Sequence, residues 1–293
     1  MRYTLRQLEV FLAVARAGSV SRAADALFLS QSAVSEALGD LERQFDARLF
    51  DRAGKRLQLG ELGRLVRARA ESVLDEARDL ENALAGRDEV GRLRIGATLT
   101  IGNHLAVPLI ARFKREHAGA EPSLTVANTA EIARLVANFE IDVGLIEGEV
   151  EHPDLTLETW REDELVVFCA PDHPFARKRS LTDNDLRGAA WIVREQGSGT
   201  RQTFDRAMHG LLPALRIALA LQHTEAIKQA VQIGLGLGCL SRIALADDFA
   251  RGSLVACRVP QRNLRRRFYF LLRKQKFRSA GVERWLALCR RDG

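Results

Sequence analysis

Residues 20–45 read VSRAADALFLSQSAVSEALGDLERQF and contain two short helical patterns that meet at a tight turn. In the first, Ala23, Ala24 and Leu27 recur at helical spacing, and the small side chains allow another helix to pack closely. After a break at residues 28–29, Ser30 can cap the second helix with its hydroxyl. The apolar stripe of that second helix consists of Val34, Leu38, Leu41 and Phe45. This arrangement predicts a helix-turn-helix.

A further helix precedes this motif, and a small hairpin follows it. Gly18 ends a predicted helix whose apolar side chains are Leu5, Leu8, Phe11, Leu12 and Ala15. Downstream, residues 49–52 and 57–59 have the pattern of two short strands, separated by the basic tip 53–56. Such a hairpin is typical of a wing. We therefore assign residues 1–60 to an all-α winged helix-turn-helix domain.

Residues 61–84 form a long helical pattern without proline and, after Gly63, without glycine. Its apolar side chains alternate four and three apart, which is a heptad seam that needs a partner helix to bury it. The seam consists of Val66, Ala70, Val73, Ala77, Leu80 and Leu84. The pattern predicts a dimerising linker helix, followed by a hinge at residues 85–90.

From residue 91 onward the pattern changes to alternating strands and helices. The first helix of this region is predicted at residues 103–116, between two short apolar strands. Later strands are predicted at 165–169 and 268–272, the latter followed by a last helix at 280–288. This alternation predicts an α/β domain with a largely parallel sheet over residues 91–293.

The composition is that of a globular protein and does not by itself indicate a nucleic-acid ligand. Hydrophobic residues make up 46% and charged residues 28%, which excludes a disordered chain. The net charge is +6, yet residues 1–60 contain nine basic and seven acidic side chains, a balance of only +2. A role in DNA binding must therefore rest on arrangement. The chain contains neither an apolar run of membrane-spanning length nor the apolar core of a signal peptide, so we expect a cytoplasmic protein without a membrane partner.

Four cysteines are spread over the second half of the chain: Cys169, Cys239, Cys257 and Cys289. They are too widely spaced for a zinc site or a disulfide framework. The six histidines show no metal-binding spacing either, so we expect reduced, mostly buried thiols and no metal. A redox-sensing role for one cysteine stays open, because a reactive thiol needs an exposed, electropositive setting that sequence cannot show.

Several of these segments resemble the signature of the LysR family of bacterial transcriptional regulators. The matching segments are 23–27, 30–35, 41–42 and 49–52. The order of helix-turn-helix, wing, linker helix and α/β sensor also matches the family over essentially the whole chain. Within the family, residues 96–103 and 196–201 look like the branch that includes regulators of sulfur assimilation and carbon fixation.

The resemblance implies a regulator that binds double-stranded promoter DNA and senses a small molecule. Its sensor would be a two-lobed α/β domain of the periplasmic-binding-protein type, with the effector between the lobes. On that template lobe I spans residues 91–161 and 266–293, and lobe II spans residues 162–265. The family also implies a homodimer or a dimer of dimers (a homotetramer) and contact with RNA polymerase.

Candidate DNA-binding residues lie in the second helix of the motif and in the wing. They are Ser30, Gln31, Ser32 and Ser35 in the helix, and Arg52, Lys55 and Arg56 in the wing. The short polar groups can meet base edges in the major groove, and the basic groups can contact phosphates or the minor groove. Two simpler interpretations stay open: a solvated helix face capped by Ser30, and an ion pair between Arg52 and an acid of the helix.

Candidate effector-binding residues lie in loops between strands and helices. They are Thr98, Thr100, Asn128, Ser198, Thr200 and Thr224. Free N–H groups at helix N-termini favour anions. Ser, Thr and Asn at such positions are often ordinary caps, but loops at the carboxyl ends of strands are where open α/β sheets bind ligands. We therefore expect a small anionic or zwitterionic effector, held by donors that have no acid chain nearby. Glu147, also at a strand end, could repel an anion, pair with Arg201 or hold an amino group.

Two further features favour simpler interpretations. The glycines of residues 234–238 follow a helix and precede a strand, the wrong order for a dinucleotide-binding fingerprint. The arginines at 265–267 precede an apolar strand, so a solvated strand end is a simpler interpretation than a second DNA surface. No motif requires catalysis or a cofactor. The alternative is a cytoplasmic small-molecule binding protein of the periplasmic-binding fold, against which the helix-turn-helix argues.

Overall fold

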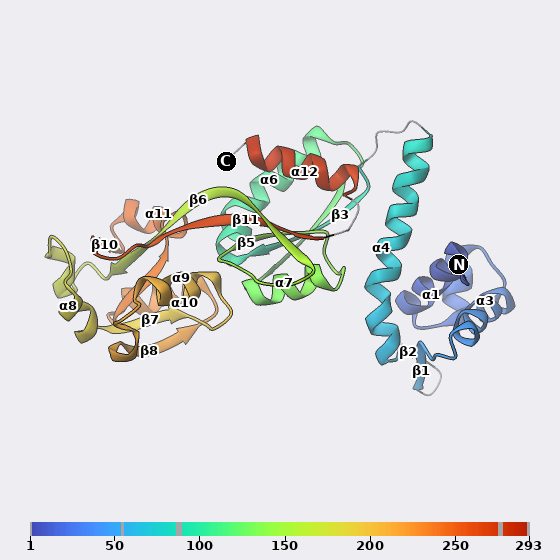
Figure 1. Cartoon of the computed structure of the whole chain (residues 1–293), viewed down its shortest axis with the longest axis horizontal. Coiled ribbons are helices and arrows are strands. Elements are labelled where there is room, and N and C mark those ends of the chain that lie inside the picture. Colours follow the sequence, from blue (N-terminus) through green and yellow to red (C-terminus); the bar gives the residue numbers. More distant parts are fainter. Residues whose placement is uncertain (1, 54–55, 86–89, 275–277, 292–293) are drawn as a thin grey trace. The chain divides into compact units, whose positions relative to one another are not determined.

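The computed structural model describes the chain except for residues 1, 54–55, 86–89, 275–277 and 292–293. The chain divides into two compact units, and the larger unit begins at Val90 (Figure 1). Most of the predicted hinge, residues 86–89, therefore lies outside the described residues.

The smaller unit is a three-helix motif with a hairpin and a long final helix. Its elements are α1 (Leu5–Ala17), α2 (Val20–Leu27), α3 (Gln31–Gln44), β1 (Phe50–Ala53), β2 (Arg56–Leu59) and α4 (Glu61–Leu84). Gly18, at φ 61°, ends α1 in the left-handed conformation that glycine adopts without strain. Ser30 caps α3 by accepting a hydrogen bond from the N–H of Ala33. The winged helix-turn-helix is therefore confirmed, with β1 and β2 forming the antiparallel wing.

One apolar core holds these helices together. Phe11 of α1 and Val34 of α3 lie at its centre, and Ala70 and Leu74 of α4 close it. Ala23 and Ala24 are almost wholly buried, as expected if their small side chains let the neighbouring helices approach α2. The linker helix thus uses part of its apolar surface within its own chain.

The larger unit is a nine-stranded sheet that runs through two lobes, in the order β4-β3-β5-β11-β6-β9-β7-β8, with β10 beside β6. The first lobe begins with β3 (Arg92–Thr98), α5 (Leu99–Ile101), the π-helical turn η1 (Gly102–Ala106) and α6 (Val107–Glu116). It continues with β4 (Glu121–Ala127), α7 (Thr129–Ala137) and β5 (Val143–Glu147), and the last helix of the chain, α12 (Ala280–Arg291), packs on it. Separate apolar clusters cover the two faces of its sheet.

The second lobe repeats the same plan. Its early elements are η2 (Pro174–Arg177), α8 (Asp183–Gly188), β7 (Ala190–Arg194), α9 (Gly199–Ala207), η3 (Leu212–Ala214) and β8 (Arg216–Leu221). Its later elements are α10 (Thr224–Gln232), β9 (Leu237–Ser241), α11 (Arg242–Arg251) and β10 (Val255–Cys257). Apolar clusters again cover both faces of the sheet, so the two-lobed α/β fold is confirmed. The expectation of a largely parallel sheet is wrong, because β6 (Leu155–Cys169) and β11 (Arg265–Arg273) run antiparallel to all their neighbours.

Two long antiparallel strands, β6 (Leu155–Cys169) and β11 (Arg265–Arg273), connect the lobes (Figure 1). Sequence patterns predicted only residues 165–169 and 268–272 as strands here. The parts of β6 and β11 that were not predicted are rich in charged side chains. They form strands because their opposite charges face one another: Arg265, Arg266 and Arg267 of β11 lie opposite Glu164, Asp163 and Glu162 of β6. The lobe boundaries proposed from the sequence fall within these two strands.

Candidate functional site

The start of α3 exposes a polar surface beside the turn of the helix-turn-helix. Gln31, Ser32 and Ser35 are all exposed. Ser30 is both a cap and part of this surface, since its hydroxyl also shares a hydrogen bond of 2.9 Å with that of Ser32. Short polar groups on the first turn of an accessible helix can reach the edges of bases.

The wing is held next to this helix by Glu42, which belongs to the family signature but to which sequence reasoning gave no role. A carboxylate oxygen of Glu42 in α3 accepts hydrogen bonds from the N–H groups of Leu49 (2.6 Å) and Phe50 (3.4 Å) at the start of β1. Arg52 and Arg56 lie in β1 and β2. Their side chains, and Lys55 as a whole, lie outside the described residues.

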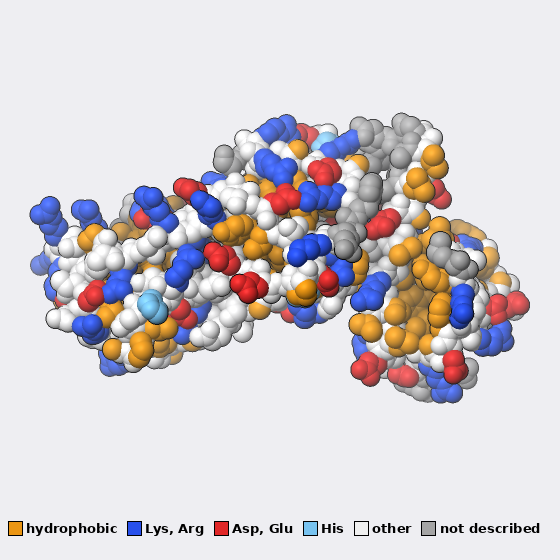
Figure 2. All heavy atoms as spheres, viewed as in Figure 1, with side chains coloured by type: hydrophobic (Ala, Val, Ile, Leu, Met, Phe, Trp, Pro, Cys, Tyr) orange, Lys and Arg blue, Asp and Glu red, His pale blue; other side chains and the backbone are white. Residues whose placement is uncertain are grey.

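The predicted dimer seam on α4 divides into two parts. Ala70 is buried in the core of its own unit, and Val66 and Val73 pack against that core while staying partly exposed. Further along, Ala77 is half-buried and Leu80 is 60% exposed. An apolar cavity of about 400 Å³, lined by α1, α3 and α4, lies beside the first part. Hydrophobic side chains gather on this unit in the space-filling view (Figure 2).

Two of the predicted effector residues converge on a buried carboxylate in the larger unit. Thr100 in α5 and Thr200 in α9 each donate a hydrogen bond of 3.2 Å to one oxygen of Glu147, at the end of β5. The other oxygen lies 3.1 Å from the guanidinium of Arg266, which also donates to the Thr200 hydroxyl at 2.9 Å. Glu147 is 1% exposed. This cluster joins both lobes to strand β11.

This arrangement corrects three sequence-based interpretations. The loops are not free of acid chains, because Glu147 lies among the predicted donors. Its partner is Arg266 rather than Arg201, which pairs with Asp205 at 2.7 Å. Arg266 is itself no solvated strand end, since its side chain is 1% exposed and contacts Asp163 at 2.6 Å. Only Arg265 and Arg267 remain exposed, as that interpretation expected.

Three other predicted effector residues have buried hydroxyls that make no hydrogen bond within the described structure. They are Thr98, Ser198 and Thr224. Thr98 and Ser198 occupy the cap positions of α5 and α9 but make no side-chain cap bond, and Thr224 is the first residue of α10. The interpretation as ordinary caps therefore fails for Thr98 and Ser198, whereas Asn128 is such a cap, because its side-chain oxygen accepts a hydrogen bond from the N–H of Glu131. Because a buried hydroxyl without a partner is costly, each of these groups points to a ligand or water beside it.

The last predicted residue, Asn128, belongs to a set of direct contacts between the lobes. Its amide lies 3.4 Å from a carboxylate oxygen of Glu195 in lobe II. Beside it, the Thr129 hydroxyl donates to the carbonyl of Glu147 and accepts from the N–H of Gly199. Any Cβ on Gly199 would lie 1.7 Å from that carbonyl oxygen, so only glycine fits where the lobes touch. A cavity of about 430 Å³ lies next to Thr129 and Ser198.

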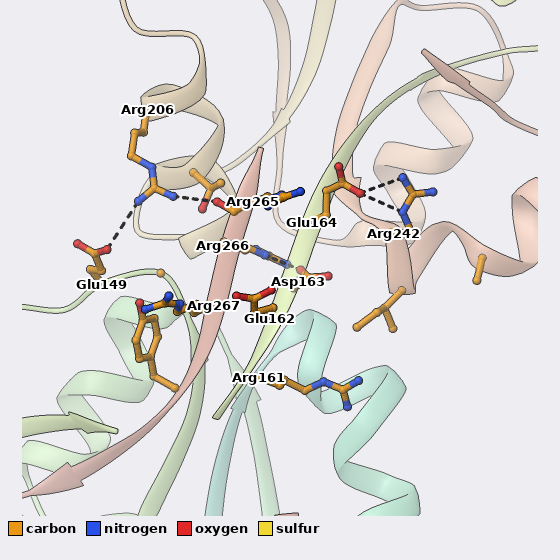
Figure 3. A pocket seen from close by; sticks show the side chains of 15 residues that line it. Glu149, Arg161, Glu162, Asp163, Glu164, Arg206, Arg242, Arg265, Arg266 and Arg267 are labelled. Atoms are coloured by element: carbon orange, nitrogen blue, oxygen red, sulfur yellow. Dashed lines mark hydrogen bonds and ion pairs between the residues drawn. The ribbon is translucent and has the colours of Figure 1, made fainter. Parts of the chain in front are cut away.

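A larger cavity, of about 950 Å³, lies along the crossing strands (Figure 3). Charged side chains of both signs line it. Arg242 pairs with Glu164 at 2.9 Å, and Arg206 lies 3.7 Å from Glu149 (Figure 3). These ion pairs lie beside the buried pair of Arg266 and Asp163, so oppositely charged side chains extend from that pair along the cavity wall.

Neither a metal centre nor a membrane span is found in the described part of the chain. Its His, Cys, Asp and Glu side chains form no group of three that could hold a metal ion. None of its helices combines the length and the apolar character needed to cross a membrane.

Known proteins share this architecture. The family model for the bacterial regulatory helix-turn-helix protein, lysR family, matches residues 5–64. The family model for the LysR substrate binding domain matches residues 86–293. Together these models match the winged helix-turn-helix and the two-lobed unit, and most of α4 lies between them.

Individual relatives match over nearly the whole chain. The HTH-type transcriptional regulator YeiE of Escherichia coli (strain K12) is 43% identical over 289 residues, which cover 99% of this chain and 98% of that protein. The RuBisCO operon transcriptional regulator of Allochromatium vinosum is 34% identical, over 94% of this chain and 92% of that protein, which confirms the suggested branch. The regulatory domain of CcmR from Synechocystis PCC6803, solved in complex with 2-PG, is 31% identical with a TM-score of 0.64, over 69% of this chain and 97% of that one. The chain therefore belongs to the LysR family of bacterial helix-turn-helix transcriptional regulators.

Proposed function

We infer that this regulator responds to a small anionic or zwitterionic effector bound where the two lobes meet. The observation that carries the proposal is the set of buried hydroxyls without partners on Thr98, Ser198 and Thr224. With Thr100, Thr200 and Asn128 they come from both lobes, so an effector held by all of them would connect the lobes. The relative CcmR, whose regulatory domain was solved with 2-PG, supports an effector of this kind.

The charges of the site restrict how such an effector binds. Glu147 and Asp163 are two carboxylates around the single guanidinium of Arg266, so the buried cluster has one negative charge in excess. A zwitterion can place its ammonium group on Glu147 while its anionic end meets the hydroxyls. A simple anion instead has to displace the Glu147 carboxylate from Thr100 and Thr200, since like charges repel at this distance.

Calorimetric titration tests the pocket. The probes are 2-PG, sulfate and a neutral α-amino acid, each added to the wild type and to a Thr100→Val, Ser198→Ala double variant. We expect at least one probe to bind the wild type and to lose affinity in the double variant. Equal affinity for both proteins would exclude this pocket.

The variant Glu147→Gln separates the two classes of effector. It removes a negative charge and keeps the size of the side chain, so an anion should bind more tightly and a zwitterion more weakly. Glu149→Gln, which alters an exposed acid near the lobe contact, is the matched control and should leave either affinity nearly unchanged.

We also propose that α3 reads the promoter and that the wing contacts its backbone. Gln31, Ser32 and Ser35 would meet base edges, while Arg52, Lys55 and Arg56 would contact phosphates. Gln31→Ala should lower the ratio of specific to random DNA binding. Arg56→Ala should weaken both and reduce the salt dependence by about one unit of slope. Equal losses on both DNAs for both variants would contradict this division.

The remaining parts of the proposal concern assembly and location. A homodimer through Val66, Val73, Ala77 and Leu80, or a dimer of such dimers, would present two copies of α3 to an interrupted palindrome. Contact with RNA polymerase would follow from binding at a promoter, and the cytoplasm is where that DNA lies. The proposal contains no catalytic step. A small-molecule binding protein without DNA is not favoured, because it leaves residues 5–64 without a role.

A further inference from the structure

Two of the four cysteines meet inside lobe II. Cys169 is the last residue of β6, and Cys257 is the last residue of the neighbouring strand β10. In the antiparallel register Cys169 lies opposite Val255, and Cys257 lies opposite Val167. The two cysteines are therefore diagonal neighbours on one face of the sheet, and their sulfur atoms are 3.4 Å apart.

A third cysteine provides a comparison within the same core. Cys239 of β9 lies opposite Val167 on the other side of β6, so Val167 separates it from Cys257. Cys239 is 2% exposed, and burial raises the pKa of its thiol to about 12. It shares the surroundings of the pair but not the sulfur contact.

We propose that Cys169 and Cys257 are a thiol–disulfide pair that hydroperoxides oxidise. The sulfur–sulfur contact, the shared sheet face and a cavity at Cys257 carry this proposal. The cavity has a volume of about 310 Å³, is lined also by Arg258 and Arg262, and brings a small oxidant to Cys257, whose sulfur contacts that of the buried Cys169. Arg258 places a positive charge at that entrance, which favours a thiolate and a departing hydroxide, whereas Arg262 is paired with Asp183.

The sulfur atoms have distinct roles. The Cys257 thiol donates a hydrogen bond to the Cys169 sulfur, and this bond holds the pKa of Cys169 below its ordinary value. The same contact, together with burial, raises the pKa of Cys257. Cys169 is therefore the nucleophile, and Cys257 stays protonated until the second step.

The reaction balances with one hydroperoxide. The Cys169 thiolate attacks one oxygen of hydrogen peroxide, a sulfur–oxygen bond forms, the oxygen–oxygen bond breaks, and the departing hydroxide takes a proton to become water. The Cys257 sulfur then attacks the Cys169 sulfenic acid, a sulfur–sulfur bond forms, and the oxygen leaves with the Cys257 proton as a second water. Two thiols are oxidised to a disulfide, and one peroxide is reduced to two waters.

Oxidation also has a mechanical consequence. A disulfide is about 2.05 Å long, so the sulfurs must approach from their present contact. The movement falls to β10, because this three-residue strand pairs with β6 alone among the described strands. The chain continues from β10 into β11, which carries Arg266 in the effector cluster. Closing the disulfide therefore ties the lobe II end of β6 to β10, the strand from which the chain runs on into β11.

The experiment uses the reduced full-length wild type treated with hydrogen peroxide. Free thiols are alkylated under denaturing conditions, and the protein is digested without reductant. We expect one peptide containing Cys169 to be cross-linked to one containing Cys257. The mass of the pair should be lower by two hydrogen atoms than the sum of the two reduced peptides, and dithiothreitol should separate them. Cys239 should be fully alkylated. Because this map needs no variant, a folding defect cannot obscure it.

Two variants check the assignment. Cys239→Ala, the matched control, should form the cross-link as the wild type does. In Cys257→Ser the cross-link should be absent, and Cys169 should be trapped as a sulfenic acid by dimedone. Full alkylation of Cys169 and Cys257 in the peroxide-treated wild type would overturn the proposal. A cross-link through Cys239, or only one between two chains, would overturn it as well.

Discussion

At the level of single residues, Phe28 has the conformation that its side chain suits least. It follows α2 at φ 55°, in the left-handed region where β-carbon contacts are unfavourable, and its ring is 96% exposed. The N–H of Leu29 bonds to the carbonyl of Ala24, which closes the helix end in the manner usually made with glycine.

We expect Phe28→Asn to stabilise the smaller unit by about 1 kcal/mol, because asparagine tolerates this conformation and no burial is lost. Urea unfolding of the two proteins measures the difference, and Phe28→Leu serves as the control that keeps a strained side chain. A loss of stability in the Asn variant would show that the ring makes contacts the present structure does not contain. Weaker DNA binding by a stabilised variant would show that the strain is kept for function.

Arg266 offers a second prediction at this level. Replacing it with methionine leaves Glu147 and Asp163 buried without their counter-charge, which should cost about 3–5 kcal/mol. The same change at Arg265 or Arg267, exposed members of the same row, should cost less than about 1 kcal/mol. Denaturant unfolding of the three variants gives the comparison. Similar losses of unfolding free energy at all three positions would mean that the buried ion pairs of Arg266 stabilise the protein no more than exposed ones.

Arg266 also shows where inference from the sequence stops. Its sequence neighbours are arginines too, and only the register of β11 against β6 decides which of the three points into the cluster. The hydroxyl-rich loops were predictable, because strand ends followed by helix starts can be recognised from pattern. Their relation to Glu147 was not, since the two lobes approach each other only through contacts distant in sequence.

At the level of secondary structure elements, one part of α4 packs in the core of its own chain, and another part leaves apolar side chains exposed. Leu74 is packed in the core, whereas Leu80 is mostly exposed. The heptad pattern predicted the helix correctly. It could not separate these two uses, because packing within the chain and packing between chains need the same apolar spacing.

This division refines a test of the dimer. Leu80→Asp should separate dimers while the thermal unfolding of the smaller unit changes little, because the new charge would lie in a seam between two chains. Leu74→Asp should instead unfold that unit. Sedimentation velocity and circular dichroism on both variants check this. An unchanged oligomeric mass for a folded Leu80→Asp protein would contradict the assignment of the seam.

The crossing strands illustrate the same limit for β structure. Residues 155–164 of β6 contain four acidic side chains, one arginine and few apolar side chains, so periodicity does not identify them as a strand. Their stability comes from β11, which lies far away in sequence. Elements stabilised by their own apolar pattern were therefore predictable, and those stabilised by a distant charged partner were not.

At the level of the whole two-lobed unit, function depends on how the lobes meet. An effector can shift that equilibrium only if it binds one arrangement more tightly than another. The contacts at Thr129 and Gly199 define the arrangement seen here, in which the lobes touch directly.

Gly199→Ala should prevent this arrangement, because its methyl group would overlap the carbonyl oxygen of Glu147. We expect the variant to lose effector affinity at least tenfold, about 1.4 kcal/mol, while binding of operator DNA without effector persists. Gly188→Ala is a control for the loss of a glycine, since nothing lies within 4 Å of its added Cβ and its φ lies outside the left-handed region. Effector titration and gel shifts measure both. Unchanged effector affinity in Gly199→Ala would mean that binding does not require these lobes to touch.

The crossing strands also determine the order in which the protein is completed during synthesis. Strand β5 leaves the ribosome long before its neighbour β11, and Trp285, at the centre of the lobe I core, emerges later still. Nearly all of lobe II is made in between and has its own sheet partners at hand. The second lobe in the sequence can therefore fold first, while the first waits for almost the last residues of the chain. A nascent chain arrested before β11 would carry a finished lobe II beside an open sheet edge.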